Sequence, residues 1–259
     1  MVKNPVIEVN HVDIIRSKDI VIQDAVFTIE QGDYVGIVGP NGGGKTTLLL
    51  AILGFIPIKR GSIKLFSKEL NVFSEWQRIA YVSQGAINFD DHFPLTVREL
   101  VSLGRITRKT LGRPFTKEDK TEVSEALNLM GIGNLAERRI GTLSGGQKQR
   151  MFIAKALVRK PEILILDEPI AGVDATALET FYKQLSDLNK KQNLTILIVS
   201  HDLSTVFCRM TKLLCVNKNV YTSTISKHTD PNIVLKKVYG EHFHFVFHDH
   251  QCKGDFTAR

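Results

Sequence analysis

The residues best suited to chemistry form a glycine-rich stretch near the N-terminus. A glycine, four further residues and then Gly-Lys-Thr is the spacing of a phosphate-binding loop. The stretch consists of Gly39, Pro40, Asn41, Gly42, Gly43, Gly44, Lys45, Thr46 and Thr47. Glycines let backbone N–H groups approach a phosphate closely, and the positive end of a following helix adds its field. We therefore predict that Lys45 contacts nucleotide phosphates and that the Thr46 hydroxyl binds Mg²⁺.

Two adjacent carboxylates could supply metal binding and acid–base chemistry. Asp167 and Glu168 follow the unbroken apolar run 163–166, which is typical of a parallel strand covered on both faces. At the end of such a strand, Asp167 could hold Mg²⁺ through water and Glu168 could orient or deprotonate an attacking water. A strand that simply ends in acidic residues is common, so this prediction depends on the phosphate loop upstream.

A second glycine-rich turn precedes a helical pattern that runs to residue 159. Its residues are Ser144, Gly145, Gly146 and Gln147. Ser144 is a natural N-cap, and the free N–H groups at the start of the helix form a second anion site. Because the chain has only one Gly-Lys-Thr loop, we infer that the second site serves the nucleotide held by another copy.

These motifs, in this order, resemble the ATP-binding subunit of ABC transporters over nearly all of the chain. Gln84 lies between the two glycine-rich turns, and Asp174 and His201 follow the acidic pair. The resemblance implies that two copies hold two ATP molecules head to tail, with residues 144–147 and Asp174 contacting the partner's nucleotide. It also implies that Gln84 binds Mg²⁺ and senses a permease. Glu168, His201 and Lys45 are the implied catalytic residues.

Arg16 departs from the family pattern. The family usually places an aromatic residue upstream of the phosphate loop to stack on adenine, and the equivalent position here falls near Arg16. Its planar guanidinium could stack on the base, or it could simply be solvated. We expect weaker recognition of the base than is usual.

The elements that must position these residues follow from hydrophobic patterning. Alternating strands are expected at 6–15, 21–30 and 62–66, and more apolar ones at 34–38, 79–83 and 195–200, with a helix at 46–53. Helical periodicity then dominates residues 97–159. We predict an α/β P-loop NTPase core with a mainly parallel sheet, an antiparallel N-terminal part and a helical subdomain inserted at about 86–160. This nucleotide-binding domain spans residues 1–225, and a tail spans 226–259.

Composition limits the other functional classes. The 259 residues are 43% apolar and 24% charged, which is ordinary for a globular protein. The longest apolar run, 48–58, is too short to span a bilayer, so any membrane role must be peripheral. The resemblance implies attachment at the cytoplasmic face of the plasma membrane. Three cysteines without a C-x-x-C pair favour a reduced compartment. The net charge of +7 is scattered in short groups, and a nucleic-acid partner is not expected.

The transported substrate is suggested by two segments. Residues 93–105 are similar to the zinc and manganese importer branch of the family, with iron-siderophore and haem importers as the alternative. Such a subunit implies a homodimer of cassettes, membrane permease subunits and an extracytoplasmic metal-binding protein as partners, with ATP and Mg²⁺ as cofactors.

The second segment is the C-terminal tail, in which a Tyr-Gly step precedes four of the eight histidines. They are His242, His244, His248 and His250. On an extended strand these histidines share one face, and those two residues apart lie about 6.6 Å from each other. They could bind a transition metal. Alternatively, phenylalanines on the other face anchor the strand and the imidazoles face water.

Overall fold

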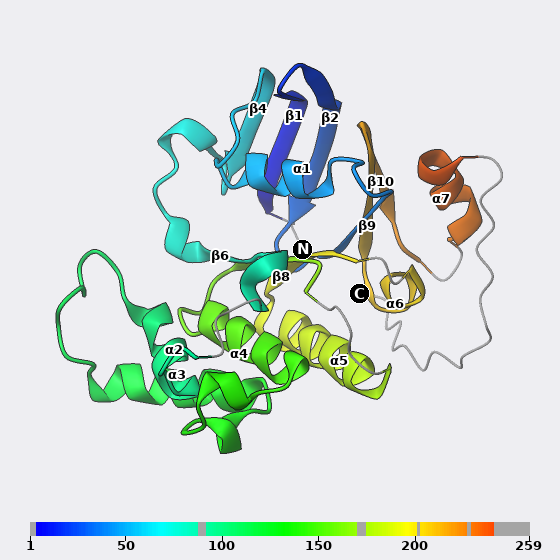
Figure 1. The fold of residues 1–259 in the computed structure, drawn as a ribbon. Helices are drawn as coiled ribbons and strands as arrows, with labels where there is room; N and C mark the ends of the chain where they lie inside the picture. The colour runs from blue at the N-terminus through cyan, green and yellow to red at the C-terminus, as the bar shows by residue number, and fades with distance from the viewer. Residues whose placement is uncertain (1–3, 88–91, 170–174, 201–202, 227–228, 241–259) are drawn as a thin grey trace. The chain divides into compact units, whose positions relative to one another are not determined.

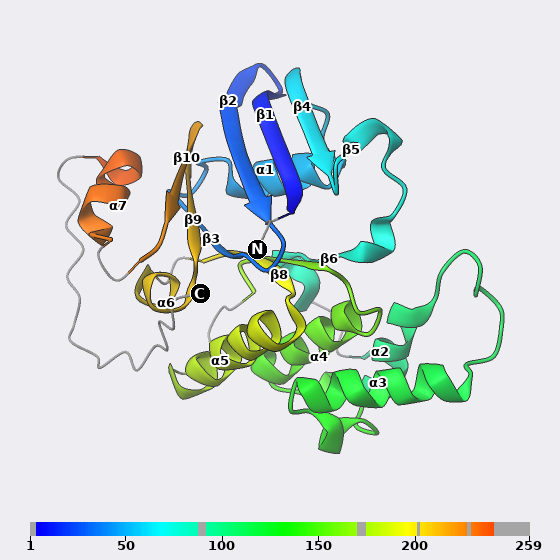
Figure 2. The ribbon, with the colours of Figure 1, turned by 180° about the vertical axis from the view of Figure 1, so that it is seen from behind.

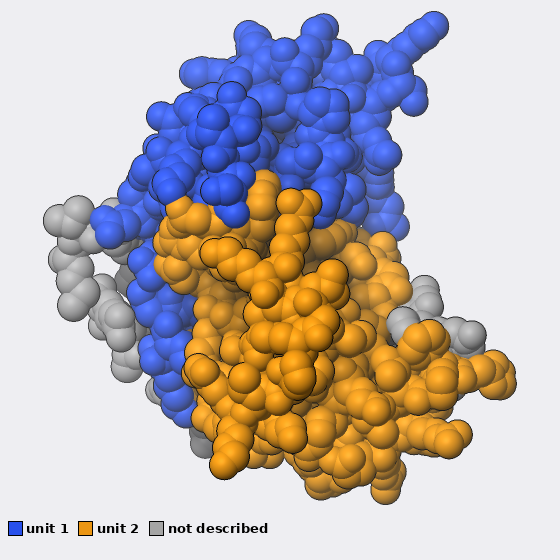
Figure 3. Space-filling view, turned by 90° about the vertical axis from the view of Figure 1, so that its left-hand side faces the viewer, with its two compact units in different colours: residues 1–74, 189–259 blue, residues 75–188 orange. Residues whose placement is uncertain are grey.

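The computed structural model describes residues 4–87, 92–169, 175–200, 203–226 and 229–240. Asp174, His201 and the four tail histidines lie outside these ranges. The chain forms two compact units, one of residues 1–74 with 189–259 and the other of residues 75–188 (Figure 3).

An antiparallel sheet forms the N-terminal part of the first unit (Figure 1). Its order is β2-β1-β4-β5, with bounds Pro5–Arg16 for β1, Asp19–Glu30 for β2, Arg60–Leu65 for β4 and Lys68–Glu69 for β5. The strands alternate buried and exposed residues as the sequence predicts, and Ile7, Val9 and Ile14 are fully buried. A single-turn 3₁₀ helix, Leu70–Val72, follows β5.

The parallel strands of the first unit are centred on β3, Tyr34–Val38. It pairs in parallel with β8, Thr195–Val199, and with β9, Lys212–Asn217, and β10, Asn219–Thr224, runs antiparallel to β9. Every residue of β3 and β8 is buried, as expected of parallel strands covered on both faces. The helices of this unit include α1 at Lys45–Ile52, α6 at Leu203–Arg209 and α7 at Pro231–Tyr239.

The second unit contains a pair of parallel strands and most of the helical sequence. Strand β6, Ile79–Val82, pairs with β7, Ile163–Asp167. Helices α2, Val97–Ser102, α3, Lys117–Leu129, and α4, Gly145–Leu157, pack against one another (Figure 2). Helix α5, Ala175–Gln192, begins in this unit. Short 3₁₀ helices occur at Trp76–Arg78, Gln84–Ile87, Leu103–Arg105, Gly133–Leu135 and Ile140–Thr142.

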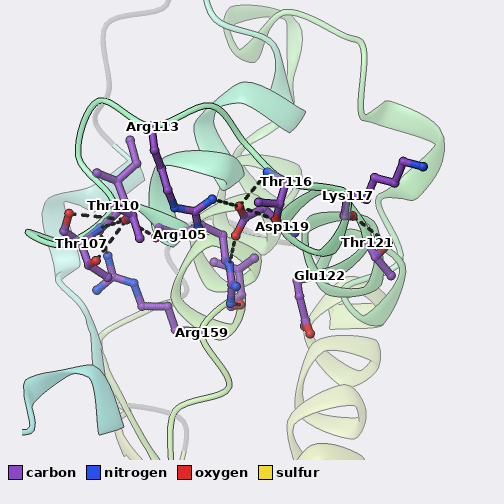
Figure 4. A network of polar contacts seen from close by, with 12 residues as sticks. Arg105, Thr107, Thr110, Arg113, Thr116, Lys117, Asp119, Thr121, Glu122 and Arg159 are labelled. Atoms are coloured by element: carbon purple, nitrogen blue, oxygen red, sulfur yellow. Dashed lines mark hydrogen bonds and ion pairs between the residues drawn. The ribbon is translucent and has the colours of Figure 1, made fainter.

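A buried carboxylate organises the start of α3 (Figure 4). Asp119 is 1% exposed and accepts hydrogen bonds from the backbone N–H and the hydroxyl of Thr116, both at 2.9 Å. Arg105 and Arg113 each place a guanidinium nitrogen 2.9 Å from its carboxylate. The Thr116 N–H, and after it the two arginines, hold the pKa of Asp119 well below its usual range despite burial. The carboxylate therefore stays ionised and joins α3 to the loop before it.

The described helices include none that is both long and apolar enough to cross a bilayer. Cys215 is a buried free thiol.

Candidate nucleotide-binding site

The phosphate loop connects β3 to α1 and requires glycine at both of its ends. Gly39 has a φ of 153° and Gly44 a φ of 101°, values that side chains rarely tolerate. A Cβ on Gly39 would lie 1.9 Å from the carbonyl oxygen of Val216, and one on Gly44 would lie 2.8 Å from Cδ1 of Ile22. The loop is therefore packed directly between the end of β9 and strand β2.

Lys45 is the buried cation of this loop. Its side chain is 6% exposed, and Nζ donates hydrogen bonds to the carbonyl oxygens of Gly39 and Pro40, each at 3.0 Å. It is also the first residue of α1, which has no acidic residue in its first turn. The ammonium group and the positive end of the helix thus act together, and the arrangement suits a phosphate anion.

The acidic pair lies at the end of β7 in the second unit. Asp167 is 1% exposed, and the hydroxyl of Tyr81 donates a hydrogen bond of 3.4 Å to its Oδ2. Burial, followed by the charge of Asp167, raises the pKa of Tyr81 to about 12. Tyr81 therefore remains a proton donor at neutral pH and helps to orient the Asp167 carboxylate. Sequence reasoning did not identify Tyr81, because a tyrosine in a strand has no motif of its own.

Gln84 and Glu168 meet at the same edge of the paired strands. Val82 of β6 is in register with Leu166 of β7, so positions two residues further along lie side by side. The Gln84 amide Nε2 donates a 2.6 Å hydrogen bond to Oε2 of Glu168. Glu168 has a φ of 46°, unusual for a residue with a side chain. The structure thus brings together Gln84, Asp167 and Glu168.

The second glycine-rich turn caps α4 as the sequence predicts. The Ser144 hydroxyl accepts from the Gln147 N–H at 3.4 Å, and the Gln147 side chain accepts from the Ser144 N–H at 3.0 Å. This reciprocal capping box fixes the start of the helix. Ser144 and Gly145 are exposed, so this end of α4 can be reached by another molecule.

Arg16 lies at the exposed end of β1, beside the turn into β2. It pairs in register with Asp19, and Ile14 pairs with Ile22. Because Ile22 packs against Gly44, the hairpin that carries Arg16 adjoins the phosphate loop. Within the first unit, Arg16 therefore belongs to the strand pair beside the loop.

Comparison with known proteins identifies the family. The ABC transporter family model matches residues 22–171, more than half of the chain. The chain is 41% identical to a zinc uptake system ATP-binding protein, ZurA, of Listeria innocua serovar 6a over 84% of each chain. It is 36% identical to the manganese transport system ATP-binding protein MntB of Bacillus subtilis over 93% of this chain and 94% of that one.

Among solved structures, the chain resembles cbiO1 from Clostridium perfringens, part of the ABC transporter complex cbiONQ. The TM-score is 0.78 at 26% identity, covering 91% of this chain and 94% of that one. The predicted fold class and the predicted resemblance are both confirmed. The chain belongs to the ABC transporter family, as its ATP-binding cassette.

Proposed function

We propose that this protein is the ATP-hydrolysing subunit that powers import of a divalent metal ion, zinc or manganese, through a membrane permease. The choice of substrate rests on one observation. The chain is 36–41% identical to zinc and manganese transport cassettes over most of its length. These relatives favour a metal ion over the alternative of an iron-siderophore or haem importer.

The phosphate loop is proposed to bind ATP. Its backbone N–H groups and the buried Lys45 ammonium together neutralise the phosphate charge, and Lys45 would exchange its contacts with the loop carbonyls for phosphate oxygens. Arg16, beside the loop, would form the wall of the adenine site. Asn41 to Thr47 complete the cradle, with Thr47 itself buried.

The oxygen atoms of Thr46, Gln84 and Asp167 are the hydroxyl, amide and carboxylate ligands that Mg²⁺ prefers. We propose that these three residues hold the ion. When bound, Mg²⁺ would neutralise phosphate charge. Asp167 is suited to this role because it is buried and its carboxylate is oriented by Tyr81.

Hydrolysis is assigned to Glu168, which orients or deprotonates the attacking water. His201 would sense the γ-phosphate. The α4 turn at Ser144, Gly145, Gly146 and Gln147 would contact the nucleotide of a second copy, together with Asp174. The exposure of Ser144 and Gly145 supports this part of the proposal, because a helix start that is reachable from outside can meet a partner's phosphate.

The proposed partners are a second cassette, the permease subunits and, through them, an extracytoplasmic metal-binding protein. We place the cassette at the cytoplasmic face of the plasma membrane, attached through the permease near Gln84. The exposed apolar residues Phe93 and Leu103 of the second unit are consistent with a protein partner.

The test of ATP binding compares two lysine variants of the full chain. Lys45→Ala removes the buried ammonium and should weaken ATP binding by more than about tenfold, because hydrogen bonds to charged groups are worth about 1.5–3 kcal/mol. Lys59→Ala, which alters an exposed lysine, is the matched control and should bind ATP normally. Equal binding by both variants would contradict the proposed phosphate site.

The test of substrate uses the complete transporter. The co-expressed permease should co-purify with this chain from membranes, and the complex reconstituted in vesicles should hydrolyse ATP faster when zinc or manganese is supplied with the metal-binding protein. Stimulation by an iron chelate or haem, without stimulation by either metal ion, would assign the alternative substrate class.

A further inference from the structure

The loop that leads into α3 in the second unit is strongly basic. Residues 106–116, called the basic loop below, contain Arg108, Lys109 and Arg113 and no acidic residue. All three cations are exposed, and Arg113 lies 2.9 Å from the carboxylate of Asp119. Among the described residues, no acidic side chain lies within ion-pair distance of Arg108 or Lys109. The loop therefore presents two positive charges that the described part of the chain does not neutralise.

The base of the basic loop is fixed against α3 and α4 (Figure 4). Asp119, in the first turn of α3, lies 2.9 Å from Arg105 at the start of the loop and 2.9 Å from Arg113 near its end. A Cβ on Gly104 would clash with the carbonyl oxygen of Lys155, so the chain packs directly against α4 where the loop begins. Because both ends are held, the residues between them have a defined direction.

Leu111 occupies the tip of this loop. The N–H of Thr110 donates to the carbonyl oxygen of Thr107 at 3.1 Å, and the N–H of Arg113 donates to that of Thr110 at 3.2 Å. Leu111 and Gly112 are thus the central residues of the second turn. Leu111 is 75% exposed, and a Cβ on Gly112 would meet no atom of the described chain within 4 Å. The loop extends outward from α2 and α3 in Figures 1 and 2, so the turn holds an apolar side chain out into solvent.

An exposed apolar tip between cations is the chemistry of a segment that binds a membrane surface. Turn residues are usually glycine, proline or small polar residues, whereas this turn places Leu111 at its tip. Phe115, 41% exposed, is a second apolar side chain of the same loop. At a bilayer surface, apolar side chains enter the headgroup boundary and neighbouring cations contact anionic lipids. A bilayer accepts a protruding side chain without a preformed socket, whereas a protein partner would need a cavity complementary to Leu111.

We propose that the basic loop docks on a membrane surface that contains anionic lipid. Leu111 enters the interface, and Arg108 and Lys109 contact headgroup phosphates. This contact goes beyond the proposed attachment through the permease, because it is made with lipid directly and requires neither the permease nor a nucleotide.

The experiment measures flotation of the full chain with vesicles in the absence of nucleotide. The chain should bind vesicles made of an equal mixture of phosphatidylcholine and phosphatidylglycerol, and it should not bind vesicles of phosphatidylcholine alone. Added salt should weaken the binding, because it screens exposed charges. Arg108→Gln combined with Lys109→Gln should lower the partition coefficient about 30-fold, since each basic residue near an anionic surface contributes about fivefold.

A matched pair of exposed lysines separates the loop from the net charge of the chain. Lys183→Gln combined with Lys190→Gln, on α5, removes the same charge and should lower the partition coefficient by less than about threefold. Leu111→Ser should lower it about 5- to 10-fold, because less apolar surface enters the interface. Val72→Ser alters a side chain that is 68% exposed in the first unit and should leave vesicle binding unchanged. All these side chains are exposed, so the unfolding midpoints of the variants should match that of the wild type.

Three results would overturn the inference. They are equal binding to neutral and anionic vesicles, an equal loss in the loop pair and the α5 pair, and absence of vesicle binding by the wild type. If the last result is accompanied by weaker co-purification of the loop pair with the permease, the basic loop meets an acidic protein segment instead. Failure of the proposed function has a separate readout, because ATP binding by Lys45→Ala is measured without vesicles.

Discussion

The side-chain amide of Gln84 donates a 2.6 Å hydrogen bond to the carboxylate of Glu168. The two residues follow neighbouring parallel strands, so the strand register brings them together. The proposed base is thereby held by the residue that is expected to sense the permease. A movement of Gln84 would then free or reorient Glu168, which offers a direct route from permease to hydrolysis.

Glu168→Gln should lower ATP turnover by about 10²- to 10⁴-fold, the usual contribution of a general base. The glutamine retains an oxygen that can accept from Gln84, so the change removes mainly the negative charge. Affinity for ATP, measured by equilibrium titration, should be unchanged and serves as the control. Near-normal turnover in this variant would remove Glu168 from the mechanism.

Tyr81→Phe tests the orientation of Asp167. The variant removes the hydroxyl that donates to Asp167. This hydrogen bond measures 3.4 Å and is therefore weak. We expect the Mg²⁺ concentration for half-maximal ATPase activity to rise about 2- to 10-fold, since one hydrogen bond to a buried carboxylate is lost. Tyr221→Phe is the control, and an equal Mg²⁺ requirement in both variants would rule out a role for Tyr81.

Asp119→Asn should destabilise the helical part of the second unit. It removes the charge that two arginines and the Thr116 capping box contact, leaving Arg105 and Arg113 without their carboxylate. The midpoint of thermal unfolding at pH 7 should fall by several degrees. Glu118→Gln changes the exposed carboxylate directly before Asp119 and should lower the midpoint of thermal unfolding much less.

The pH dependence of this effect has a definite sign. The folded-state pKa of Asp119 lies below its ordinary value of 3.8, so its stabilising contribution is fully present above that value. It is lost as the pH falls below 3.8 toward the folded-state pKa, because the unfolded chain binds the proton first. The difference in unfolding midpoint between wild type and Asp119→Asn should therefore shrink as the pH is lowered from about 4 to about 2. A constant difference over that range would contradict an ionised, stabilising Asp119.

Local sequence signals predicted much of the architecture. The alternating runs 6–15 and 21–30 correspond to strands Pro5–Arg16 and Asp19–Glu30, and the apolar run 163–166 corresponds to Ile163–Asp167. Ser144 caps α4 as expected. These signals depend on residues close together in the chain, where periodicity and capping chemistry act directly.

Contacts between distant residues were not predictable in the same way. Tyr81 and Asp167 are 86 residues apart, and their meeting depends on strand pairing rather than on a motif. Helix α7 lies within residues 226–259, for which the sequence predicts a tail with a histidine-rich strand and no helix. The signal was present, since Asp230 caps the Asn232 N–H at 2.8 Å and Pro231 occupies the first turn. The hydrogen bond from the Asn217 amide to the Val238 carbonyl oxygen, between residues 21 apart, likewise required both the helix and the β9–β10 turn.

Arg16→Tyr tests the proposed adenine wall. A tyrosine ring stacks on a base more favourably than an exposed guanidinium that competes with water, and the hairpin that carries Arg16 adjoins Gly44. ATP should bind several-fold more tightly to this variant, as measured by calorimetry. Arg16→Ala, which offers no plane for stacking, should not bind more tightly. Unchanged affinity in Arg16→Tyr would show that the adenine lies elsewhere.

Metal binding by the histidine tail can be tested with a truncation after α7. Gly240 caps the C-terminal end of α7, so a chain that stops there keeps the whole helix while losing His242, His244, His248 and His250. If the tail binds metal, the full chain should take up more zinc than the shortened chain in a calorimetric titration. A full-length variant with all four histidines changed to alanine should then match the shortened chain, because the phenylalanines remain. Equal zinc stoichiometry in all three proteins would instead assign the tail a purely structural role.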